Sequence, residues 1–579
     1  MERHLSTDSA VLFINLITKN VMNTKKRIHF SLLLSLISVI CLAMPAKRIK
    51  RSLTLADGTT VMATLVGDEN GHWYVDDMGK ALSEDNTGVA HYLSLYELDT
   101  RQRAMTERMA MRNKSRKARL AKAKQMSSAI TRGSDETIYE GYTGKKKGLV
   151  ILVNFTDKKF TFKRADFLAL ANEKGYNKDG AQGSVSDYFR DQSYGKFELQ
   201  FDVVGPYDLS HDMKYYGKND DRDDDVLPGD MVTEAVKLAD KDVNYADYDW
   251  NRDGEMDQVY IIYAGYSEEQ GGPAYAIYSH EWDLESAHYF NYGGEGAILL
   301  DNVWINTYAC SSELKDFTGK KMNGIGTMCH EFSHCLGLPD LYDTAIGINF
   351  GMGTWSLMDY GSYNGDSYRP CGYTSYERWA AGWLEPVELS ATTSVTGMKP
   401  ITEAPEAYVI YNDANNNEYY LLENRQLTSW DEAGYGHGLL ILHVDYDQKA
   451  WEDNTVNNEA SHQRLTIIHA DNDDLYTSFE GDPYPGTSGN NALTDFSIPA
   501  ARLYNANTDG KLFMRKPITD ITENADSTIG FNFSNSKNPT GITQHQTSAS
   551  KKIYSITGQY MGTDLKKLPQ GVYKVKAGR

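Results

Sequence analysis

The 579-residue sequence has little cysteine, no excess of positive charge and no long apolar run. Its 59 lysines and arginines face 79 acidic residues, which gives a formal net charge of -20 at pH 7. Nucleic acids and anionic membrane surfaces attract proteins with a basic excess, so we exclude nucleic acid as a partner. A membrane span needs about 20 consecutive apolar residues, and the apolar stretch at 30–42 is shorter. We therefore expect no transmembrane anchor.

The cysteine content excludes a disulfide scaffold. After residue 43 the chain has four widely spaced cysteines, Cys310, Cys329, Cys335 and Cys371. They leave room for one bridge, but not between Cys329 and Cys335 if one helix carries both. With 41% hydrophobic and 11% aromatic residues the chain is globular, and its length suits three or more domains. Core burial and metal ions must then supply most of the stability.

Residues 1–43 are predicted to be a signal peptide region. A basic stretch at 25–27 precedes the apolar stretch at 30–42, and small residues follow it. The first 21 residues include acidic side chains that suit a signal peptide poorly, so we expect translation to begin at Met22. The sequence thus predicts a secreted or cell-surface protein.

The segment 326–340 fits the pattern HExxHxxGxxD. His330 and His334 are four residues apart, so on an α-helix their rings lie one above the other and can bind one metal ion. Glu331 lies about 100° round the helix, beside the metal rather than on it. A carboxylate there can take a proton from a metal-bound water, which is the general-base position of a metallopeptidase.

Gly337 and Asp340 extend this pattern. Gly337 permits the backbone reversal that ends the helix, and Pro339 cannot easily extend it, so Asp340 can approach the metal as a third ligand. Three protein ligands leave a fourth position to water, as in catalytic zinc sites. We therefore predict Zn²⁺ as cofactor and peptide-bond hydrolysis through a metal-activated water as the reaction. The alternative is a surface-displayed adhesin or binding protein with a residual metal site.

Several further segments resemble known families. Residues 353–361, Gly-Thr-Trp-Ser-Leu-Met-Asp-Tyr-Gly, look like the methionine turn of metzincin peptidases, with Met358 in the key position. With Asp340 as third ligand, the chain resembles the bacterial immune-inhibitor-A-like metallopeptidases. The resemblance covers residues 52–535 and is carried also by segments 183–195, 249–257, 423–425, 436–445, 451–457 and 481–486. It implies a secreted zinc-dependent endopeptidase that is made as a zymogen, cleaves proteins or peptides and often binds calcium.

The resemblance also implies a role for Tyr360, two residues after Met358. Some metzincins use a tyrosine at this offset as a labile zinc ligand, which swings to donate to the tetrahedral oxyanion. The alternative is that Tyr360 only packs near the floor of the site.

A second metal site is predicted around Gly254. Oxygen-bearing side chains stand at alternate positions about this glycine turn, which suits a hard cation such as Ca²⁺; they are Asp249, Asn251, Asp253 and Asp257. The loop departs from an EF-hand because its twelfth position is Tyr260 and the chain continues as a strand. We therefore predict a structural Ca²⁺ site, with a solvated acidic turn as the alternative.

The fold class is predicted to be α+β. Helical and strand-like segments alternate in the first half, with helices expected at 164–173, 185–193 and 229–239 and strands at 148–155, 197–204, 257–264 and 302–309. This order suits a metzincin-like catalytic domain at 133–395, with a twisted mixed sheet and an active-site helix. A β-sandwich domain is predicted to follow at 396–536, with strands at 407–411, 418–424, 438–445, 464–469 and 528–533.

Residues 44–132 are predicted to form a propeptide. The part up to residue 98 alternates apolar and polar residues between turns at 57–58, 77–79 and 86–88, as a small β-rich module does. The stretch 101–132 is strongly basic, which predicts an exposed helix or linker whose cleavage releases the catalytic domain; a merely solvated linker is the alternative. Because cysteine is missing from 44–309, a carboxylate such as Asp68 or Asp76 is the candidate to displace the metal-bound water.

Residues 537–579 are predicted to be a polar linker followed by a short β segment. The strand-turn-strand pattern at 553–575 resembles the C-terminal sorting modules of gliding-type bacterial secretion, which implies secretion machinery as a partner. The alternative is a short strand pair that packs on the sandwich.

Overall fold

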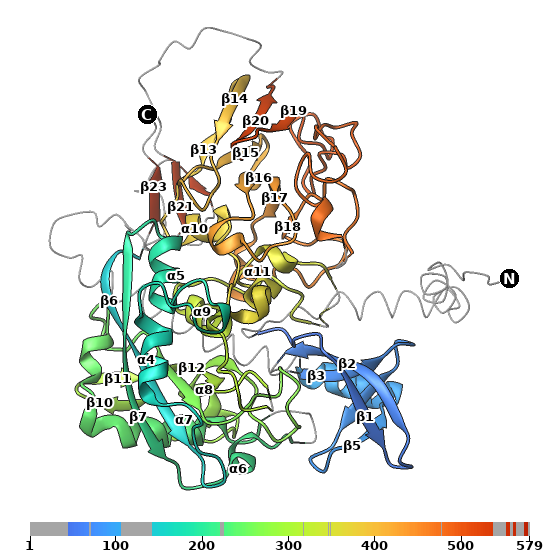
Figure 1. Ribbon diagram of the computed structural model, residues 1–579. Helices are drawn as coiled ribbons and strands as arrows, with labels where there is room; N and C mark the ends of the chain where they lie inside the picture. The colour runs from blue at the N-terminus through green and yellow to red at the C-terminus, as the bar shows by residue number, and fades with distance from the viewer. Residues whose placement is uncertain are drawn as a thin grey trace. The chain divides into compact units, whose positions relative to one another are not determined.

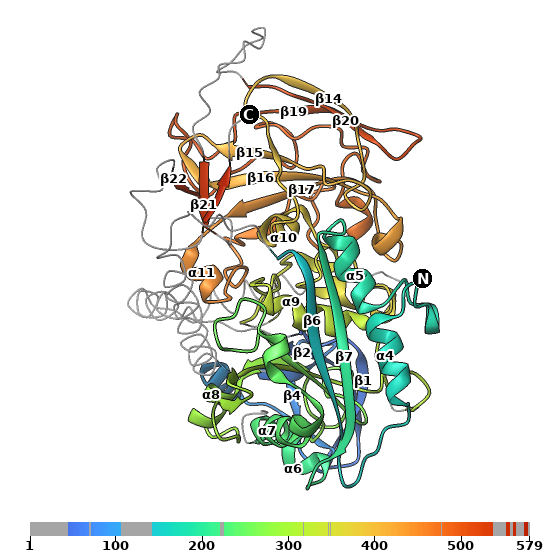
Figure 2. The same ribbon diagram turned by 90° about the vertical axis from the view of Figure 1, so that its left-hand side faces the viewer.

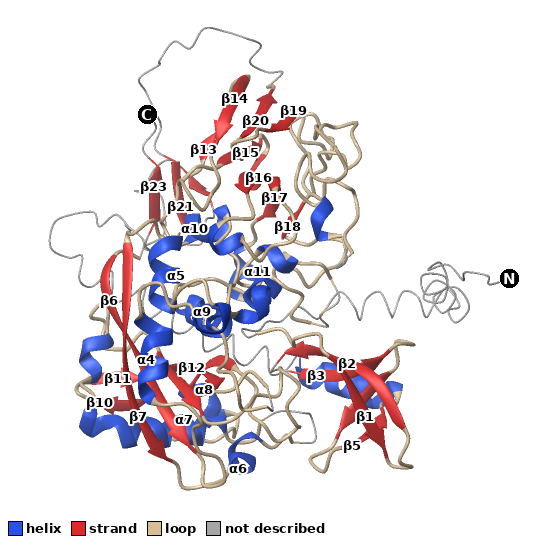
Figure 3. Cartoon of the chain, in the orientation of Figure 1, coloured by secondary structure: helices blue, strands red, loops and turns tan. Residues whose placement is uncertain are grey.

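The computed structural model describes residues 44–68, 71–105, 142–220, 225–316, 318–345, 347, 349–475 and 478–535, and the strands at 552–555, 560–562 and 573–576. Helices and strands are mixed along this chain, as the predicted α+β class requires (Figure 3). The predicted signal region, nearly all of the basic stretch and most of the C-terminal segment lie outside the described residues. Within the described parts, no helix combines the length and the hydropathy needed to cross a bilayer.

Strands β1 to β5 close into a small barrel. Their bounds are Lys50–Leu55, Thr60–Asp68, Gly71–Asp76, Ala81–Glu84 and Val89–Tyr92. Sequential strands pair antiparallel, and a short parallel pairing of β1 with β5 closes the ring, which leaves the sheet without an open edge. The interior holds the side chains of Leu53, Ala63, Leu65, Tyr74, Leu82 and Ala90.

The three turns predicted between these strands are present. An aspartate precedes or begins each turn and accepts the N–H two residues later, as Asp57 does from Thr59 at 2.9 Å. Each turn ends on a glycine with positive φ, a conformation that costs glycine no steric strain; these are Gly58, Gly79 and Gly88. The aspartate caps the turn and the glycine permits its backbone.

A five-stranded mixed sheet organises the region that carries the catalytic motif. Its order is β7-β6-β8-β12-β9, with bounds Phe197–Asp208, Gly144–Asn154, Val259–Tyr263, Thr307–Ser312 and His280–Asp283. Neighbours are parallel except at the edge, where β9 is antiparallel to β12. Strand β6 alternates its side chains between two cores, with Val150 and Leu152 in one and Leu149 and Ile151 in the other. Burial on both faces explains why this strand is a continuous apolar run.

Helices cover both faces of this sheet. On the face of Val150 lie α4 (Arg164–Asn172), α5 (Val185–Gln192) and α9 (Ile325–Cys335), and α4 and α5 pack against β7 (Figures 1 and 2). On the other face lie α6 (Met213–Gly217), α7 (Pro228–Ala239) and α8 (Leu284–Tyr289). The start of α5 is set by a capping box, in which Ser184 and Asp187 each accept the backbone N–H of the other.

The strand predicted at 302–309 is in fact two strands. β10 (Ile298–Leu300) and β11 (Val303–Ile305) form a hairpin, and β12 begins only at Thr307. The hairpin turns at Asp301 and Asn302, whose φ values of 48° and 65° are those of a type I′ turn. The Asp-Asn pair between apolar residues was the sequence signal for this hairpin.

Two more sheets follow the catalytic motif. The first has the order β13-β15-β16-β17-β18, with bounds Val387–Glu388, Tyr408–Asn412, Asn415–Arg425, Gly438–Asp445 and Leu465–Ile467. The second has the order β14-β20-β19, with bounds Thr393–Met398, Ile529–Phe533 and Ile518–Glu523. The five strands predicted in this part of the chain are therefore present. Two short helices accompany the first of these sheets: α10 (Ser375–Ala380) precedes it in the sequence, and α11 (Gln448–Glu452) lies between β17 and β18.

The first of these sheets is buried on both faces. Leu421 and Leu442 belong to the same core as the catalytic helix α9, whereas Leu422 and Ile441 pack with the second sheet. The core behind the catalytic motif is therefore continuous with strands that lie about a hundred residues further along the chain.

The remaining elements are short. The C-terminal strands β21 (Lys552–Ser555), β22 (Tyr560–Gly562) and β23 (Tyr573–Lys576) form a sheet in the order β22-β21-β23. Short 3₁₀ segments stand at Lys178–Gly180, Asp240–Asp242, Tyr245–Tyr248, Gly353–Trp355, Tyr360–Ser367, Ser429–Asp431 and Phe479–Gly481, and the segment Tyr360–Ser367 is interrupted by a kink.

Candidate metal centre

Helix α9 holds the HExxH residues in a tightly packed setting. A Cβ on Gly326 would stand 1.9 Å from the carbonyl oxygen of Ser362, so only glycine lets the helix approach this segment. The helix ends at Cys335, and Gly337 follows with a φ of +84°, the left-handed conformation that reverses the chain. The predicted reversal before Asp340 is therefore present.

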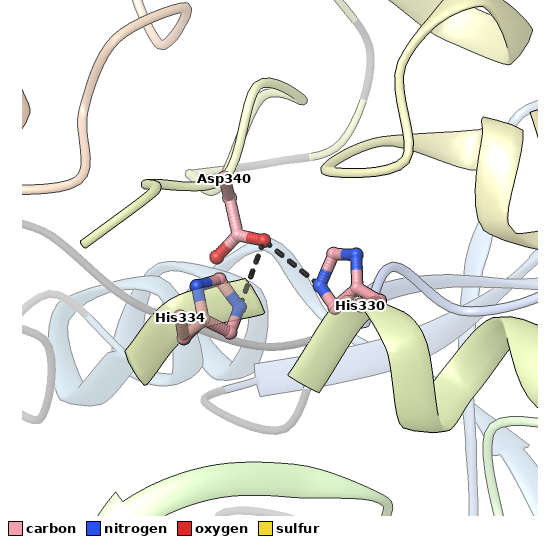
Figure 4. A group of neighbouring side chains, drawn as sticks. All are labelled: His330, His334 and Asp340. Atoms are coloured by element: carbon pink, nitrogen blue, oxygen red, sulfur yellow. Dashed lines mark ion pairs between the residues drawn. The ribbon is translucent and has the colours of Figure 1, made fainter. Parts of the chain in front are cut away.

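The structure brings His330, His334 and Asp340 together (Figure 4). Asp340 Oδ1 lies 3.1 Å from Nε2 of His330 and 3.6 Å from Nε2 of His334. All three residues are buried, and within the described parts of the chain they are the one group of three or more His, Cys, Asp or Glu ligand atoms within 4.8 Å of one another. Neither Asp68 nor Asp76 of the barrel joins this group.

The second ring nitrogen of each histidine is held by a backbone carbonyl. His330 Nδ1 lies 2.8 Å from the oxygen of Leu357, and His334 Nδ1 lies 2.9 Å from that of Leu338. A carbonyl can only accept, so each Nδ1 carries a proton and each Nε2 is the ring atom directed toward Asp340. Two neutral imidazoles oriented in this way and one carboxylate are a donor set that fits Zn²⁺.

The electrostatics of the centre favour a positive charge between the three ligands. Burial lowers the pKa of the His330 ring, but the hydrogen bond and charge of Asp340 raise it, with a net pKa of about 9. The site therefore attracts a proton when no other cation is bound, and a divalent cation would compete for the same place.

Glu331 is fully buried beside this group. Neither of its carboxylate oxygens has a hydrogen-bond partner among the described residues. Burial raises its pKa, the charge of His330 lowers it and that of Asp340 raises it again, to about 8. A carboxylate with both oxygens available and a pKa near neutrality can accept a proton and give it back.

The segment around Met358 supports the centre through its backbone. The carbonyl of Leu357 orients His330, and the carbonyl of Met358 accepts the N–H of Leu341, one residue after Asp340. The Met358 side chain is fully buried in the core that contains α9. Glu377 stabilises the segment around Met358 by accepting a hydrogen bond of 2.6 Å from the hydroxyl of Ser356.

Tyr360 is engaged by the N-terminal part of the chain. Its hydroxyl accepts a hydrogen bond of 3.0 Å from Nε of Arg48, whose guanidinium carbon lies 5.1 Å from the centre of the Tyr360 ring. Burial raises the pKa of Tyr360, and the charge of Arg48 lowers it. This contact of Tyr360 was not foreseen from the sequence.

The four predicted calcium ligands line one loop before β8. Asp249 and Asn251 accept the backbone N–H of Asp253, and Asp257 accepts that of Trp250 at 2.7 Å. Burial and the charges of Asp253 and Asp249 raise the pKa of Asp257, against the hydrogen bond from Trp250, to about 7. These residues are thus gathered about the Gly254 turn, but less tightly than the three residues of the histidine centre.

Other polar side chains of the described chain have structural roles. His280 contacts the carbonyl of Tyr278 at 2.7 Å and the hydroxyl of Tyr308 at 3.0 Å, so its ring joins β9 to β12. Asp76 accepts N–H groups in the β3–β4 turn. In the described chain Cys310, Cys329, Cys335 and Cys371 are free thiols, so the one bridge left open does not form.

Asn454 is a neighbour of Asp340 that sequence reasoning missed. Its Nδ2 donates to Asp340 Oδ2 at 2.7 Å, and its Oδ1 accepts the N–H of Asp340 at 2.6 Å. The signal lay in the segment 451–457, which was noted for its family resemblance, but nothing in it pointed to a residue 114 positions earlier.

Comparison with known proteins identifies this region. Residues 134–385 match the model of the immune inhibitor A peptidase M6 catalytic domain. The chain is 30% identical over 244 residues to the pre-pro-metalloprotease PrtV of Vibrio cholerae serotype O1, an alignment that covers 37% of this chain and 25% of that protein. It is 26% identical over 306 residues to the immune inhibitor A of Bacillus thuringiensis subsp. alesti, covering 45% of this chain and 44% of that protein. The chain thus spans less than half the length of each relative, and its residues 134–385 are similar to the catalytic domain of the immune inhibitor A (peptidase M6) metallopeptidases.

Proposed function

We propose that this chain is a secreted zinc-dependent endopeptidase that hydrolyses protein substrates and is made as a zymogen. The observation that carries the proposal is the convergence of His330, His334 and Asp340, with Glu331 buried beside them and both of its oxygens without a partner among the described residues. The similarity of residues 134–385 to the immune inhibitor A catalytic domain supports the same chemistry.

The proposed reaction assigns one role to each residue. Zinc held by His330, His334 and Asp340 would polarise the scissile carbonyl and bring the pKa of a bound water to about 7. Glu331 would serve as the general base that takes up a proton from water and returns it to the leaving amine. Its raised pKa of about 8 lets it hold the proton between the two steps.

Tyr360 is proposed to stabilise the oxyanion. Its phenol can donate a hydrogen bond to the negative charge that develops on the carbonyl oxygen. Arg48 contacts both the hydroxyl and the ring of Tyr360, so substrate would reach Tyr360 only after Arg48 has moved.

The zymogen part of the proposal rests on residues 44–48, which lie against the catalytic region. Tyr363 donates a hydrogen bond to the carbonyl of Pro45 at 2.8 Å, and Arg48 donates to the carbonyl of Gly347 at 2.6 Å as well as to Tyr360. Met44 is fully buried. A segment held in this way competes with substrate for the surface beside the metal ligands.

Cleavage within 101–132 is proposed to free the barrel and the segment before it. Nearly all of this basic stretch lies outside the described residues, so this part of the proposal rests on the sequence. Exposed basic segments are readily cut by proteases. The printed name of the Vibrio relative, a pre-pro-metalloprotease, describes a precursor of the same kind.

Three further assignments complete the proposal. A structural Ca²⁺ would be held by Asp249, Asn251, Asp253 and Asp257, and it would neutralise the like charges of the three aspartates. The sheets after residue 395 act as a β-sandwich that walls the catalytic cleft, next to a metzincin-like catalytic domain. The C-terminal strands address the chain to secretion machinery.

The decisive experiment compares the wild-type chain with Glu331→Gln. Both proteins should bind one zinc ion with similar affinity, whereas only the wild type, after activation, should hydrolyse casein in a chelator-sensitive way. Hydrolysis that survives Glu331→Gln would contradict the assignment of the base. A wild-type chain that binds zinc but hydrolyses no protein would favour the alternative, a surface binding protein with a residual metal site.

A further inference from the structure

Asp340 is held at two points by one side chain. Asn454 Oδ1 accepts the backbone N–H of Asp340 at 2.6 Å, and Asn454 Nδ2 donates to Asp340 Oδ2 at 2.7 Å. The other carboxylate oxygen, Oδ1, is the atom that faces the two histidines. Asn454 therefore separates the two oxygens of Asp340 into one that is held by the protein and one that is offered to a metal.

An asparagine suits this task better than other side chains. The backbone N–H of Asp340 needs an acceptor and its Oδ2 needs a donor, and a primary amide offers both on one carbon. An aspartate in its place would set two carboxylates against each other, and an alanine would leave two buried polar groups of Asp340 without these bonds. Asn454 is itself fully buried, so water does not replace it.

The backbone at Asn454 is fixed to present this amide. Its φ is +49°, in the left-handed region that asparagine tolerates better than most residues. It follows α11, and its N–H donates to the carbonyl of Trp451. Trp451 in turn is fully buried and donates from Nε1 to the hydroxyl of Tyr376 at 2.5 Å.

The same segment is fastened to the loop that carries Asp340. Thr344 donates its hydroxyl to the carbonyl of Asn454 at 2.9 Å and its N–H to Oδ1 of Asn458 at 2.9 Å. Asn457 donates to the carbonyl of Leu341 at 2.6 Å. These bonds hold segment 454–458 and loop 340–344 together independently of the Asn454 side chain.

We propose that Asn454 is a positioning residue of the metal centre, which orients Asp340 so that Oδ1 faces the histidines. This rests on the proposed zinc site. It also means that the metal centre is completed from outside residues 134–385, because Asn454 comes 69 residues after the end of that family domain. Ligand-orienting contacts of this kind typically change metal affinity by about 10–100-fold when they are removed.

The test measures zinc affinity of the full-length chain by competition with a chromogenic chelator. All variants carry Glu331→Gln, which prevents self-digestion. The informative variant is Asn454→Gly, because glycine adopts a φ of +49° without strain while it removes the amide. We expect zinc affinity to fall by about 10–100-fold, and the visible absorption of the Co²⁺-loaded protein to shift as Asp340 loses its fixed orientation.

The matched control is Asn458→Ala. It removes the bonds to Thr344 in the same segment but touches neither the Asn454 side chain nor Asp340. We expect its zinc affinity to stay within about twofold of the reference and its Co²⁺ spectrum to be unchanged. Thermal unfolding of the metal-free proteins shows how much each substitution disturbs the fold itself.

Three outcomes decide the inference. A large loss of affinity in Asn454→Gly, with metal-free stability similar to that of Asn458→Ala, supports it. Unchanged affinity and spectrum in Asn454→Gly, or an equal loss in Asn458→Ala, would overturn it. If the Glu331→Gln reference binds no zinc at all, the proposed zinc function fails first, so the two failures are distinguishable.

Discussion

Arg48 and Tyr360, 312 residues apart in the sequence, are joined by a hydrogen bond of 3.0 Å. Arg48 lies just before the N-terminal barrel, and Tyr360 lies two residues after Met358 at the metal centre. The bond links the proposed propeptide directly to a residue that we expect to act on substrate. We therefore expect the proposed activation to break this hydrogen bond.

Loss of the Arg48 side chain should weaken inhibition in the uncleaved chain. Arg48→Met removes the bonds to Tyr360 and Gly347, which are partly exposed and together contribute on the order of 1 kcal/mol, or about fivefold. Hydrolysis of a fluorogenic peptide by chain shown on gels to be intact should rise by that factor. Lys50→Met removes a nearby charge that pairs within the barrel and should leave the rate unchanged. Equal rates for all three proteins would refute the inhibitory role of Arg48.

Zinc should stabilise the wild-type chain through His334. At a free concentration of about 100 times the dissociation constant, binding adds roughly 2.7 kcal/mol, which raises the unfolding temperature by several degrees. His334→Ala should abolish this shift. His280→Ala, which removes a buried histidine bonded to Tyr278 and Tyr308, should lower stability but keep the shift. A zinc shift that persists in His334→Ala would place the metal elsewhere.

Asp257 should destabilise the folded chain without calcium and stabilise it when calcium is bound. Burial and two neighbouring carboxylates raise its pKa to about 7, so without calcium its charge destabilises the folded chain at pH 8. Asp257→Asn should therefore be as stable as wild type, or more stable, in a calcium chelator. In millimolar calcium the wild type should become the more stable protein. Thermal unfolding with and without calcium measures both, and a variant that is less stable in both conditions would contradict the site.

Gly326 should tolerate no side chain. Its missing Cβ faces the carbonyl of Ser362 at 1.9 Å, so Gly326→Ala must displace the catalytic helix and should cost about 3 kcal/mol or more. Gly337→Ala is the contrast, because no atom lies within 4 Å of its Cβ and the cost is backbone strain of about 1 kcal/mol. Urea unfolding of both variants measures the difference, and similar midpoints would contradict the close approach at Gly326.

Glu418 should make the chain sensitive to acid. It is fully buried, which raises its pKa, but contacts with His443 and backbone N–H groups outweigh burial and lower the pKa below the ordinary value. Its stabilisation is therefore complete above the unfolded pKa of about 4.3 and is lost as pH falls through the lower folded value. Glu418→Gln should lower the urea midpoint at pH 7, and this deficit should shrink toward pH 3. The exposed Glu459→Gln should leave the urea midpoint at pH 7 unchanged.

Much of the centre was predictable because its chemistry is local in sequence. His330, Glu331 and His334 are positioned by one helix, and Gly337 reverses the chain toward Asp340 within three residues. Helix periodicity and glycine conformation are properties of short segments, so the spacing alone was enough. The alternating strands and the three barrel turns were predictable for the same reason.

The contacts that span the chain were not predictable in this way. Asn454 meets Asp340 across 114 residues, and Arg48 meets Tyr360 across 312. No periodicity within a segment specifies such a pairing, because it is set by how sheets and loops pack. The hairpin at Asp301 was missed for a different reason. Its type I′ turn has a local signal in the sequence, but the apolar residues around it were interpreted as one strand.

The distance in sequence between Asp340 and Asn454 has a consequence for biosynthesis. A nascent chain grows at roughly 5–20 residues per second, so Asn454 emerges from the ribosome about 6–23 seconds after Asp340. During that interval Asp340 exists without the residue that we propose orients it. A truncated translation product that stops before Asn454 therefore carries the whole HExxHxxGxxD motif without the side chain that holds Asp340.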